Sequence, residues 1–494
     1  MTLHPNDFLK SEAVAATGPA VARRRKMRPA AQTGEPVVPQ SVRGRFRRLK
    51  WAMVALCLGV YYVVPFLRWS RGAGQPDQAI LFDLAGLRFY IFGLEFQPQE
   101  LYYLTALMIA ATIALVLTNT LSGRIWCGYF CPQTVWSDLF QLVERRLEGD
   151  RNERMRQLHM PMTLARRARK LLKHVIWLAI AFGTGGAFVL YFADAPTLLG
   201  DVFTGQASVA AYGAILTLTT TTWLLAGFAR EKMCTYMCPW PRLQGAVWDP
   251  EALVVTYRDY RGEERMSAKK AAAARAAGRP AGDCVDCMAC VHVCPMGIDI
   301  RNGPSIACIN CGLCVDACDT TMGKLGRERG LIDYESWTNI ERGRAGQSRK
   351  PVRLLRPKVV ALSVALLAIV AGVALSVSAR GTLHLGVSHD RNPIAVMLSD
   401  GSVRNAYEVR VETLAGAGGD LTLEVAGNAP LHVAVIGGET SDSGRVPISL
   451  GSGLSRQFRV TVAGETALEG DLVFTLTQTA SGESVSVTNF FKLP

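Results

Sequence analysis

Eight of the thirteen cysteines lie in one short stretch of the chain, where they form two copies of the pattern C-x-x-C-x-x-C-x-x-x-C. In this pattern three closely spaced thiolates bind one [4Fe–4S] cluster, and the more distant fourth thiolate reaches across to the other cluster. The spacing therefore predicts two clusters. The expected ligands are Cys284, Cys287, Cys290 and Cys318 for the first cluster, and Cys294, Cys308, Cys311 and Cys314 for the second.

A structural zinc site and a disulfide framework are the alternatives for such cysteines, because both occur in small cysteine-rich domains. The tandem repetition favours the two clusters over either alternative. Asp319 follows the last cysteine of the second copy, where the first copy has Pro295. That difference alters a turn and removes no ligand. His292, Met288 and Met296 fall among the cysteines and are expected to fill space, since the thiolates already complete both sets.

A second type of cysteine motif also occurs twice. The first copy reads C-G-Y-F-C-P from Cys127, the second reads C-T-Y-M-C-P from Cys234, and each follows the end of an apolar segment. Paired thiols in matching positions can bind soft copper(I), hold a further iron or iron–sulfur centre, or cycle through disulfides. We predict a catalytic redox or metal site at Cys127, Cys131, Cys234 and Cys238. Cys57 stands alone in an apolar segment and is expected to be a packing residue.

Apolar segments long enough to cross a membrane must position these motifs. The chain has 494 residues, of which 49% are hydrophobic, and its mean hydropathy is +0.17. A helix rises 1.5 Å per residue, so a crossing needs about 20 apolar residues. Five segments are close to this length, and we predict five transmembrane helices at residues 51–67, 101–121, 175–193, 209–229 and 359–378.

The distribution of lysine and arginine gives these helices a direction. Basic residues precede the first helix and fill the connection between the second and third, whereas residues 194–208 contain none. Because basic residues are retained on the cytoplasmic side, we expect the amino end and the cluster segment in the cytoplasm and the carboxyl end in the periplasm of a bacterial inner membrane. The net charge of +13 lies largely beside these helices, so lipid rather than nucleic acid is the expected partner.

The carboxyl-terminal part changes to an alternation of apolar and polar residues, separated by Gly, Asp, Asn and Ser. This pattern predicts an antiparallel immunoglobulin-like sandwich. Its expected strands are 407–411, 421–425, 431–435, 458–462, 472–476 and 485–491. An external copper site at His384, His389, Met397 and His432 is conceivable, but scattered surface residues are the preferred interpretation.

These observations predict a multi-domain membrane protein with a five-helix transmembrane region, a small ferredoxin-like insert and an all-β sandwich. Between the first two helices, residues 81–96 are aromatic-rich and are expected to form an amphipathic segment at the membrane surface. The expected order is a disordered basic tail at 1–50, four helices with the paired motifs at 51–281, the two-cluster domain at 282–330, a basic linker at 331–358, the fifth helix at 359–378 and the sandwich at 382–494.

The combination of the paired C-x-x-x-C-P motifs, the double ferredoxin pattern, five membrane helices and a terminal sandwich resembles the FixG/CcoG/RdxA family of accessory proteins of cbb-type cytochrome c oxidase. The NapH and NosR proteins share the two kinds of cysteine motif, and the terminal sandwich distinguishes the chain from them. The resemblance implies a membrane-bound cupric reductase, which converts Cu(II) to Cu(I) for the copper centre of the oxidase.

On this interpretation the cofactors are two [4Fe–4S] clusters, copper is the substrate or ligand at the paired motifs, and a further metal there is an open alternative. The implied partners are oxidase subunits or copper-handling assembly factors, together with an unidentified electron donor. Two other functions remain as hypotheses. One is a quinol-linked electron-transfer subunit of the NapH/NosR type, and the other is a non-enzymatic scaffold for oxidase assembly.

Overall fold

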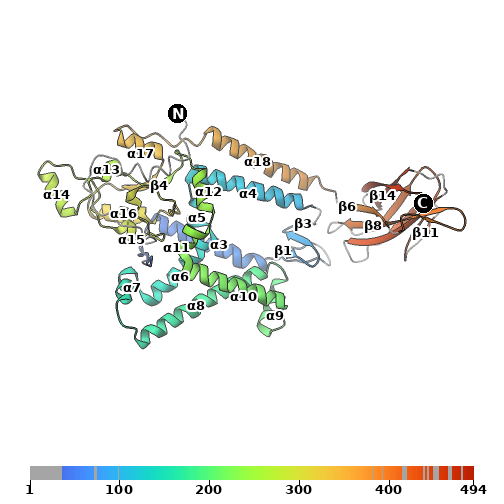
Figure 1. Cartoon of the computed structure of the whole chain (residues 1–494), viewed down its shortest axis with the longest axis horizontal. Coiled ribbons are helices and arrows are strands. Elements are labelled where there is room, and N and C mark those ends of the chain that lie inside the picture. The colour runs from blue at the N-terminus through green and yellow to red at the C-terminus, as the bar shows by residue number, and fades with distance from the viewer. Residues whose placement is uncertain are drawn as a thin grey trace. The chain divides into compact units, whose positions relative to one another are not determined.

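The computed structural model describes residues 36–71, 75–97, 100–381, 383–391, 393–413, 420–437, 440–441, 444–448, 455–464, 470–479 and 482–493. The chain divides into two compact units. The first contains residues 1–65 and 101–371, and the second contains residues 66–100 and 372–494. Each unit is considered by itself. Figure 1 shows α14, α15, α16 and α17 gathered at one end of the first unit.

Five helices in the described part of the chain are long and apolar enough to cross a membrane, as predicted. In four of them less than a fifth of the apolar window is buried within the protein, and in the span Leu164–Val189 the share is 39%. Helices that face lipid on most sides are expected to show such low burial. They are α3 (Arg45–Val63) with the 3₁₀ turn η1 (Val64–Phe66), α4 (Leu101–Ser122), α8 (Leu164–Val189), α10 (Val209–Leu224) with its continuation to Ala246, and α18 (Pro357–Ser378).

The fourth span is irregular where it reaches the second cysteine motif. After α10 it passes through two π-helical turns, which are rare and frequent at functional sites. These are η3 (Leu225–Ala229) and η4 (Met233–Met237), separated by α11 (Arg230–Lys232) and followed by α12 (Trp240–Ala246).

The first span begins earlier than predicted. The backbone amides of Phe46 and Arg47 donate to the side chain of Asp316, which satisfies amides that the first helical turn leaves free. Lys50 is buried and its Nζ lies 3.0 Å from Asp138 Oδ2. The prediction of a disordered tail that extends to residue 50 is therefore wrong for residues 36–50. Residues 1–35 lie outside the described part of the chain.

The segment between the first two spans is a small antiparallel sheet, and its predicted place at the membrane surface stays a prediction. Its strands are β1 (Ile80–Asp83), β2 (Arg88–Ile91) and β3 (Leu94–Phe96). Phe89 pairs with Phe82 on one side and with Phe96 on the other.

The two-cluster domain extends beyond the predicted residues 282–330. Strand β4 (Val254–Tyr257) pairs with β5 (Ile332–Glu335), which joins the segments before and after the cysteines. Val255, Tyr257 and Ile332 are buried in the same apolar cluster as Cys284 and Cys318. The helices of this region are α13 (Asp259–Gly262), α14 (Ala268–Ala276), α15 (Ala289–His292), the 3₁₀ turn η5 (Ile300–Asn302), α16 (Leu313–Lys324) and α17 (Trp337–Arg344).

Four shorter helices connect the spans. They are α5 (Ile125–Tyr129), α6 (Pro132–Glu148), α7 (Arg151–Leu158) and α9 (Ala195–Thr204). Pro132 occupies the first position of α6, where its missing N–H would have no partner within the helix. The proline of the first motif therefore starts a helix that leads away from the cysteines.

The carboxyl-terminal sandwich has the predicted all-β structure, and each of the six predicted strands lies within an observed strand. One sheet has the order β11-β10-β13-β8-β6, with β7 paired to β8, and the other has the order β12-β9-β14-β15. The strands are β6 (Leu383–His389), β7 (Val396–Met397), β8 (Val403–Thr413), β9 (Leu421–Ala426), β10 (Leu431–Val435), β11 (Thr440–Ser441), β12 (Arg445–Ile448), β13 (Ser455–Gly464), β14 (Gly470–Gln478) and β15 (Ser484–Phe491).

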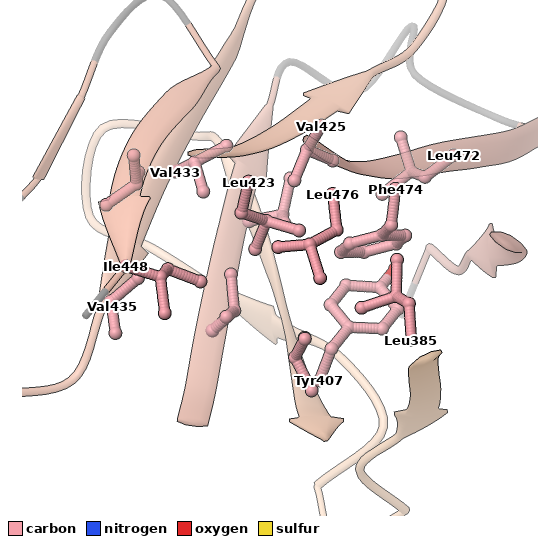
Figure 2. Packing of buried hydrophobic residues seen from close by; sticks show 14 of the residues in the cluster. Leu385, Tyr407, Leu423, Val425, Val433, Val435, Ile448, Leu472, Phe474 and Leu476 are labelled. Atoms are coloured by element: carbon pink, nitrogen blue, oxygen red, sulfur yellow. The ribbon is translucent and has the colours of Figure 1, made fainter. Parts of the chain in front are cut away.

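Alternate residues of these strands point into a common core, as the period of two requires. Tyr407, Leu423 and Phe474 are fully buried there. Figure 2 shows that side chains from both sheets meet in this core, including Leu385, Tyr407 and Phe474.

Candidate iron–sulfur and thiol site

The eight cysteines of the ferredoxin pattern line two cavities. One cavity is lined by Cys284, Cys287, Cys290 and Cys318, and the other by Cys294, Cys308, Cys311 and Cys314. Cys290 also reaches the wall of the second cavity. Each lining contains the complete ligand set that the sequence predicts, including the cysteine that crosses over from the other copy. The fold thus places the fourth cysteine of each copy with the first three cysteines of the other copy, as predicted.

The residues present fit iron–sulfur clusters better than either alternative. The thirteen cysteines all lie in the described part of the chain, and none of them is in a disulfide there. Among the described residues, no three His, Cys, Asp or Glu side chains are placed to hold one metal ion. A structural zinc ion needs four ligands at about 2.0–2.3 Å from one point, whereas the thiolates of a [4Fe–4S] cluster bind different iron atoms. Separated thiols around a cavity suit the cluster.

The two cavities have different walls. Apart from its cysteines, the second cavity is lined by apolar residues and Gly312. The first contains one charged side chain, Arg301, which pairs with Asp299 and Asp286 at 2.7 and 2.6 Å. Burial lowers the pKa of Arg301, but its bonds to the two carboxylates raise it by more, so the guanidinium stays charged. Charge and hydrogen bonding around a cluster set its reduction potential.

Burial determines the protonation state of the cysteine thiols in the second cavity. It raises the pKa of Cys294 to about 12 and that of Cys308 to about 11. Uncharged thiols are favoured in such an apolar wall unless a cation compensates the thiolate. Iron would supply that compensation, so cluster binding releases protons from these side chains.

The first C-x-x-x-C-P motif is packed against the loop that carries the second ligand set. Cys127 lies in α5 and Cys131 caps α6. Tyr129 Oη donates to the carbonyl oxygen of Cys311 at 3.1 Å. Gly128 faces the same loop, and a Cβ there would lie 2.5 Å from the carbonyl oxygen of Ile309. The motif needs glycine at this position because a loop backbone occupies the space of a side chain.

The loop itself is fixed to the end of the second span. Asn310 has a φ of 55°, in the left-handed region that asparagine tolerates. Its side-chain amide donates to Ser122 and Leu253, and its side-chain oxygen accepts from the amide of Val255. Cys308 and Cys311 flank it, so these bonds position two predicted cluster ligands relative to the membrane helices.

The second motif is arranged differently from the first. Cys234 lies in the π-helical turn η4, and Cys238 follows that turn. Tyr236 and Met237 are 63% and 62% exposed, whereas the equivalent Tyr129 is buried. The repeated sequence therefore produces one motif that docks on the cluster domain and one whose central residues face outward. Gln133 connects the two, since its amide donates to the carbonyl oxygens of Leu225 and Arg230.

The fold brings the four motif cysteines together beside the second cavity. Cys127 and Cys234 pack against the buried cluster that contains Ile309 and Cys311. Cys234 interacts electrostatically with the three other motif thiols. Burial raises the pKa of Cys127 to about 11, and Cys131 adds to the rise while Arg124 opposes it. The sequence prediction that these cysteines form one group agrees with this placement.

The four motif thiols are not arranged as a preformed metal site in the described part of the chain. No three ligating side chains in the described part of the chain converge on a single point. The motif cysteines do not share one helical face either, because Cys131 begins a new helix and the second motif is π-helical. More than two of these thiols could bind one soft ion only if their side chains moved closer together.

Arg124 is a site residue that the sequence did not reveal. Its guanidinium donates to the carbonyl oxygens of Ile306 and Pro241. It interacts electrostatically with Cys308 of the second ligand set and with Cys127, Cys234 and Cys238. Nothing in the local sequence distinguishes Arg124 from the other basic residues beside membrane helices, so only the fold identifies it.

Met296, Met288 and His292, which were expected to fill space among the cysteines, each contact other parts of the protein. Met296 is buried in the wall of the second cavity, Met288 Sδ accepts from Arg301, and the carbonyl oxygen of His292 accepts from the amide of Gln40. In the sandwich, His389 bonds to Asn405 and stacks on Phe490. His389 is thus engaged within its own domain.

Family comparisons agree with this arrangement. Residues 229–337 match a "4Fe-4S dicluster domain", residues 104–148 match a "4Fe-4S binding domain", and residues 373–494 match the "IG-like fold at C-terminal of FixG". The second of these matches contains Cys127 and Cys131 as its only cysteines. A crystal structure of a FixG-related protein from Vibrio parahaemolyticus is similar to 23% of the chain, with 16% identity and a TM-score of 0.19.

The relatives extend over most of the chain. Protein RdxA of Cereibacter sphaeroides is 46% identical over 445 residues, which cover 88% of this chain and 92% of RdxA. Nitrogen fixation protein FixG of Rhizobium meliloti is 45% identical, with 88% and 85% covered. The ferredoxin-type protein NapH of Escherichia coli is 24% identical over 56% of the chain and 89% of NapH. The chain is a membrane iron–sulfur electron-transfer protein that belongs to the FixG/RdxA family.

Proposed function

We propose that the protein is a cupric reductase, which passes single electrons to Cu(II) and releases Cu(I) for the assembly of a cbb-type cytochrome c oxidase. The observation that carries the proposal is the contact between the two kinds of cysteine site. The motif cysteines Cys127 and Cys234 pack against the apolar cluster around Cys311, one of the predicted iron–sulfur ligands. The proposed copper ligands thus lie next to a proposed iron–sulfur ligand.

The chemistry of the donors matches that task. When bound, [4Fe–4S] clusters at the two ligand sets supply single electrons. Copper(I) is softer than copper(II) and prefers thiolate ligands, so paired thiols favour the reduced ion over the oxidised one. In the reaction each Cu(II) gains one electron and becomes Cu(I), and thiol protons are released as the thiolates bind it. Cys127, Cys131, Cys234 and Cys238 are the proposed ligands.

Residues around the thiols prepare the site. Arg124 is held by two carbonyl oxygens and places a fixed positive charge beside Cys127 and Cys234. That charge lowers the cost of a thiolate in a half-buried position. Gly128 and Tyr129 keep the first motif against the cluster loop. The distance that an electron must cross is therefore set by backbone packing rather than by flexible side chains.

The proposal includes a location and partners. The protein lies in the bacterial inner membrane, with the amino end and the iron–sulfur domain in the cytoplasm and the sandwich in the periplasm. Support comes from the distribution of basic residues around the five spans. Copper-handling assembly factors or oxidase subunits receive the Cu(I), and a cytoplasmic donor supplies the electrons.

Replacement of the four motif cysteines tests this function. We expect the variant Cys127→Ser, Cys131→Ser, Cys234→Ser, Cys238→Ser to reduce Cu(II) at the rate of protein-free buffer, because no soft ligands remain beside the electron carrier. Copper reduction is measured anaerobically with a Cu(I)-specific chelator, and the dithionite-reduced clusters are measured by EPR.

The matched control is Cys57→Ser, which removes a thiol from the first span and none from the site. It should reduce copper at the wild-type rate. Copper reduction that persists in the fourfold variant, with both cluster signals intact, would show that copper is reduced elsewhere.

A further inference from the structure

One predicted iron–sulfur ligand is accessible from the surface. Cys287 is the only exposed cysteine among the thirteen, all of which lie in the described part of the chain. The other ligands of its set, Cys284, Cys290 and Cys318, are buried. In the second set Cys311 is buried and the other three are half-buried, and the motif cysteines Cys127 and Cys234 pack against the same apolar cluster. An electron from outside therefore has its shortest entry at Cys287.

A basic helix lies beside this entry. The segment that leads into α14 is bonded to the first ligand set, because the amide of Met266 donates to the carbonyl oxygen of Cys284. At the far end of α14, Arg275 Nη2 lies 3.3 Å from the carboxylate of Asp283, the residue before Cys284. Both ends of the helix are thus anchored to the loop that carries Cys284.

The free surface of this helix is cationic. No acidic residue occurs between Arg265 and Gly282. Lys269, Lys270, Arg275 and Arg279 are exposed, whereas Ala271 and Ala274 are buried against the domain. The alanine side of α14 is therefore packed against the domain. The exposed side presents basic residues to a partner.

We propose that α14 and Cys287 form the docking surface for a small acidic one-electron carrier protein, which delivers electrons to the cluster held by Cys284, Cys287, Cys290 and Cys318. In the step the reduced carrier loses one electron and the cluster gains it, with no bond or proton transferred. Complementary charge speeds such encounters and orients them. The inference rests on the iron–sulfur part of the proposed function and not on copper.

An anionic membrane surface is the other conceivable partner of a basic helix. Helices that bind membranes insert large apolar residues such as Trp, Phe or Leu. The exposed side of α14 has only alanine and basic residues. Within the first unit, Figure 1 shows α14 at the end remote from the spans α4 and α10. These features favour the soluble carrier.

Charge reversal on the helix tests the surface. The variant Lys269→Glu, Lys270→Glu is compared with Arg391→Glu, Arg404→Glu, which makes the same charge change on exposed residues of the second unit. The probe is flavodoxin in its hydroquinone form. Full-length protein with both clusters is used, without copper, and two quantities are measured: the rate of cluster reduction and the affinity for oxidised flavodoxin.

We expect Lys269→Glu, Lys270→Glu to slow cluster reduction and weaken binding by about tenfold or more, and to remove the decrease in wild-type rate with added salt. The Arg391→Glu, Arg404→Glu variant should behave like wild type. Dithionite should reduce the clusters of all three proteins fully, which shows that the domain is folded. Because copper is absent, failure of the proposed copper reaction cannot produce this result.

Several results would overturn the proposal. One is a wild-type protein that flavodoxin neither binds nor reduces, and another is an equal rate in both charge-reversed variants. A third is binding of wild-type protein, but not of Lys269→Glu, Lys270→Glu, to vesicles of anionic lipid while the flavodoxin rate stays unchanged. That last result would assign α14 to the membrane surface instead.

Discussion

At the scale of single residues, Gly128 links the two redox sites. It lies between Cys127 and Tyr129 in the first motif, and its Cα faces the backbone of the loop that carries Cys308 and Cys311. A Cβ would lie 2.5 Å from the carbonyl oxygen of Ile309 and 3.3 Å from the amide of Cys311. Backbone atoms cannot rotate away as a flexible side chain can. The first motif can therefore approach the Cys308–Cys311 loop this closely only because Gly128 has no Cβ atom.

Replacement of Gly128 by alanine should displace the loop. Overpacking of this kind costs about 1–3 kcal/mol, and the strain falls on the ligands Cys308 and Cys311. We expect Gly128→Ala to lower the occupancy of the second cluster while the first is retained, as measured by EPR and by the iron content of purified protein. The control Gly245→Ala places its Cβ in open space on α12. Full occupancy of the second cluster in Gly128→Ala would contradict this account.

At the scale of elements, a buried ionic network joins the helices below the thiol site. Glu144 of α6 lies 2.7 Å from Arg230 of α11, 3.1 Å from Arg154 of α7 and 3.5 Å from Lys173 of α8. The side chain of Glu144 is only 3% exposed. Three helices therefore contribute cations to one buried carboxylate, and the network fixes the position of the π-helical segment that leads to the second motif.

This network predicts sensitivity to acid. Burial raises the pKa of Glu144, but Arg230, Arg154 and Lys173 lower it by more, and the net pKa lies below the ordinary 4.5. A carboxyl whose pKa is lower in the folded state contributes stability above its unfolded pKa, and this contribution is lost as the pH falls through the folded pKa. Glu144→Gln should remove it and leave the buried Arg230 without a carboxylate, at a cost of about 3–5 kcal/mol. Arg154 and Lys173 keep their ion pairs with Glu148.

The measurement is the denaturant midpoint of the detergent-solubilised protein from pH 7 downward to below pH 4.5. Glu144→Gln should be less stable at pH 7 and should show a flatter decline toward low pH than wild type. The control is Glu153→Gln, which removes an exposed pair with Arg156 and should change stability by less than about 1 kcal/mol. Equal losses of stability in the two variants would mean that the buried network contributes no more stability than an exposed ion pair.

At the scale of the whole molecule, the two units have separate cores. The sandwich core contains only residues between Leu383 and Phe491, whereas the buried clusters around the cysteines contain only residues of the first unit. Domains with their own cores fold as units. The sandwich has no cysteine and therefore contributes no thiolate ligand to the redox sites.

Deletion of residues 382–494 should leave the iron–sulfur domain intact. We expect about eight iron atoms and eight sulfides per chain, as two [4Fe–4S] clusters require, and cluster EPR signals like those of the full-length protein. Arg380, which bonds to Glu100, is retained so that the strand β1–β3 segment keeps this contact. Loss of iron from the shortened protein would show that the sandwich supports the clusters after all.

Local patterns explain why much of this protein could be predicted. The five spans followed from runs of apolar residues, and the six main strands followed from alternation, because both patterns depend on neighbouring residues. The boundaries were less accurate. The first helix begins at Arg45 because Asp316, distant in sequence, caps it. The strands within residues 80–96 were not predicted, because their register pairs Phe89 with both Phe82 and Phe96 across turns.

The sequence by itself determined the chemistry of the protein: eight thiols in a spacing suited to two clusters, and four more in paired motifs beside membrane helices. The tertiary structure decided how these sites relate. Tyr129 bonds to Cys311 across 182 positions of sequence, Arg124 lies among thiols from three segments, and Cys287 alone is exposed. The spacing of cysteines predicts what a few neighbouring residues can bind. The contacts between the sites form only after distant segments pack together.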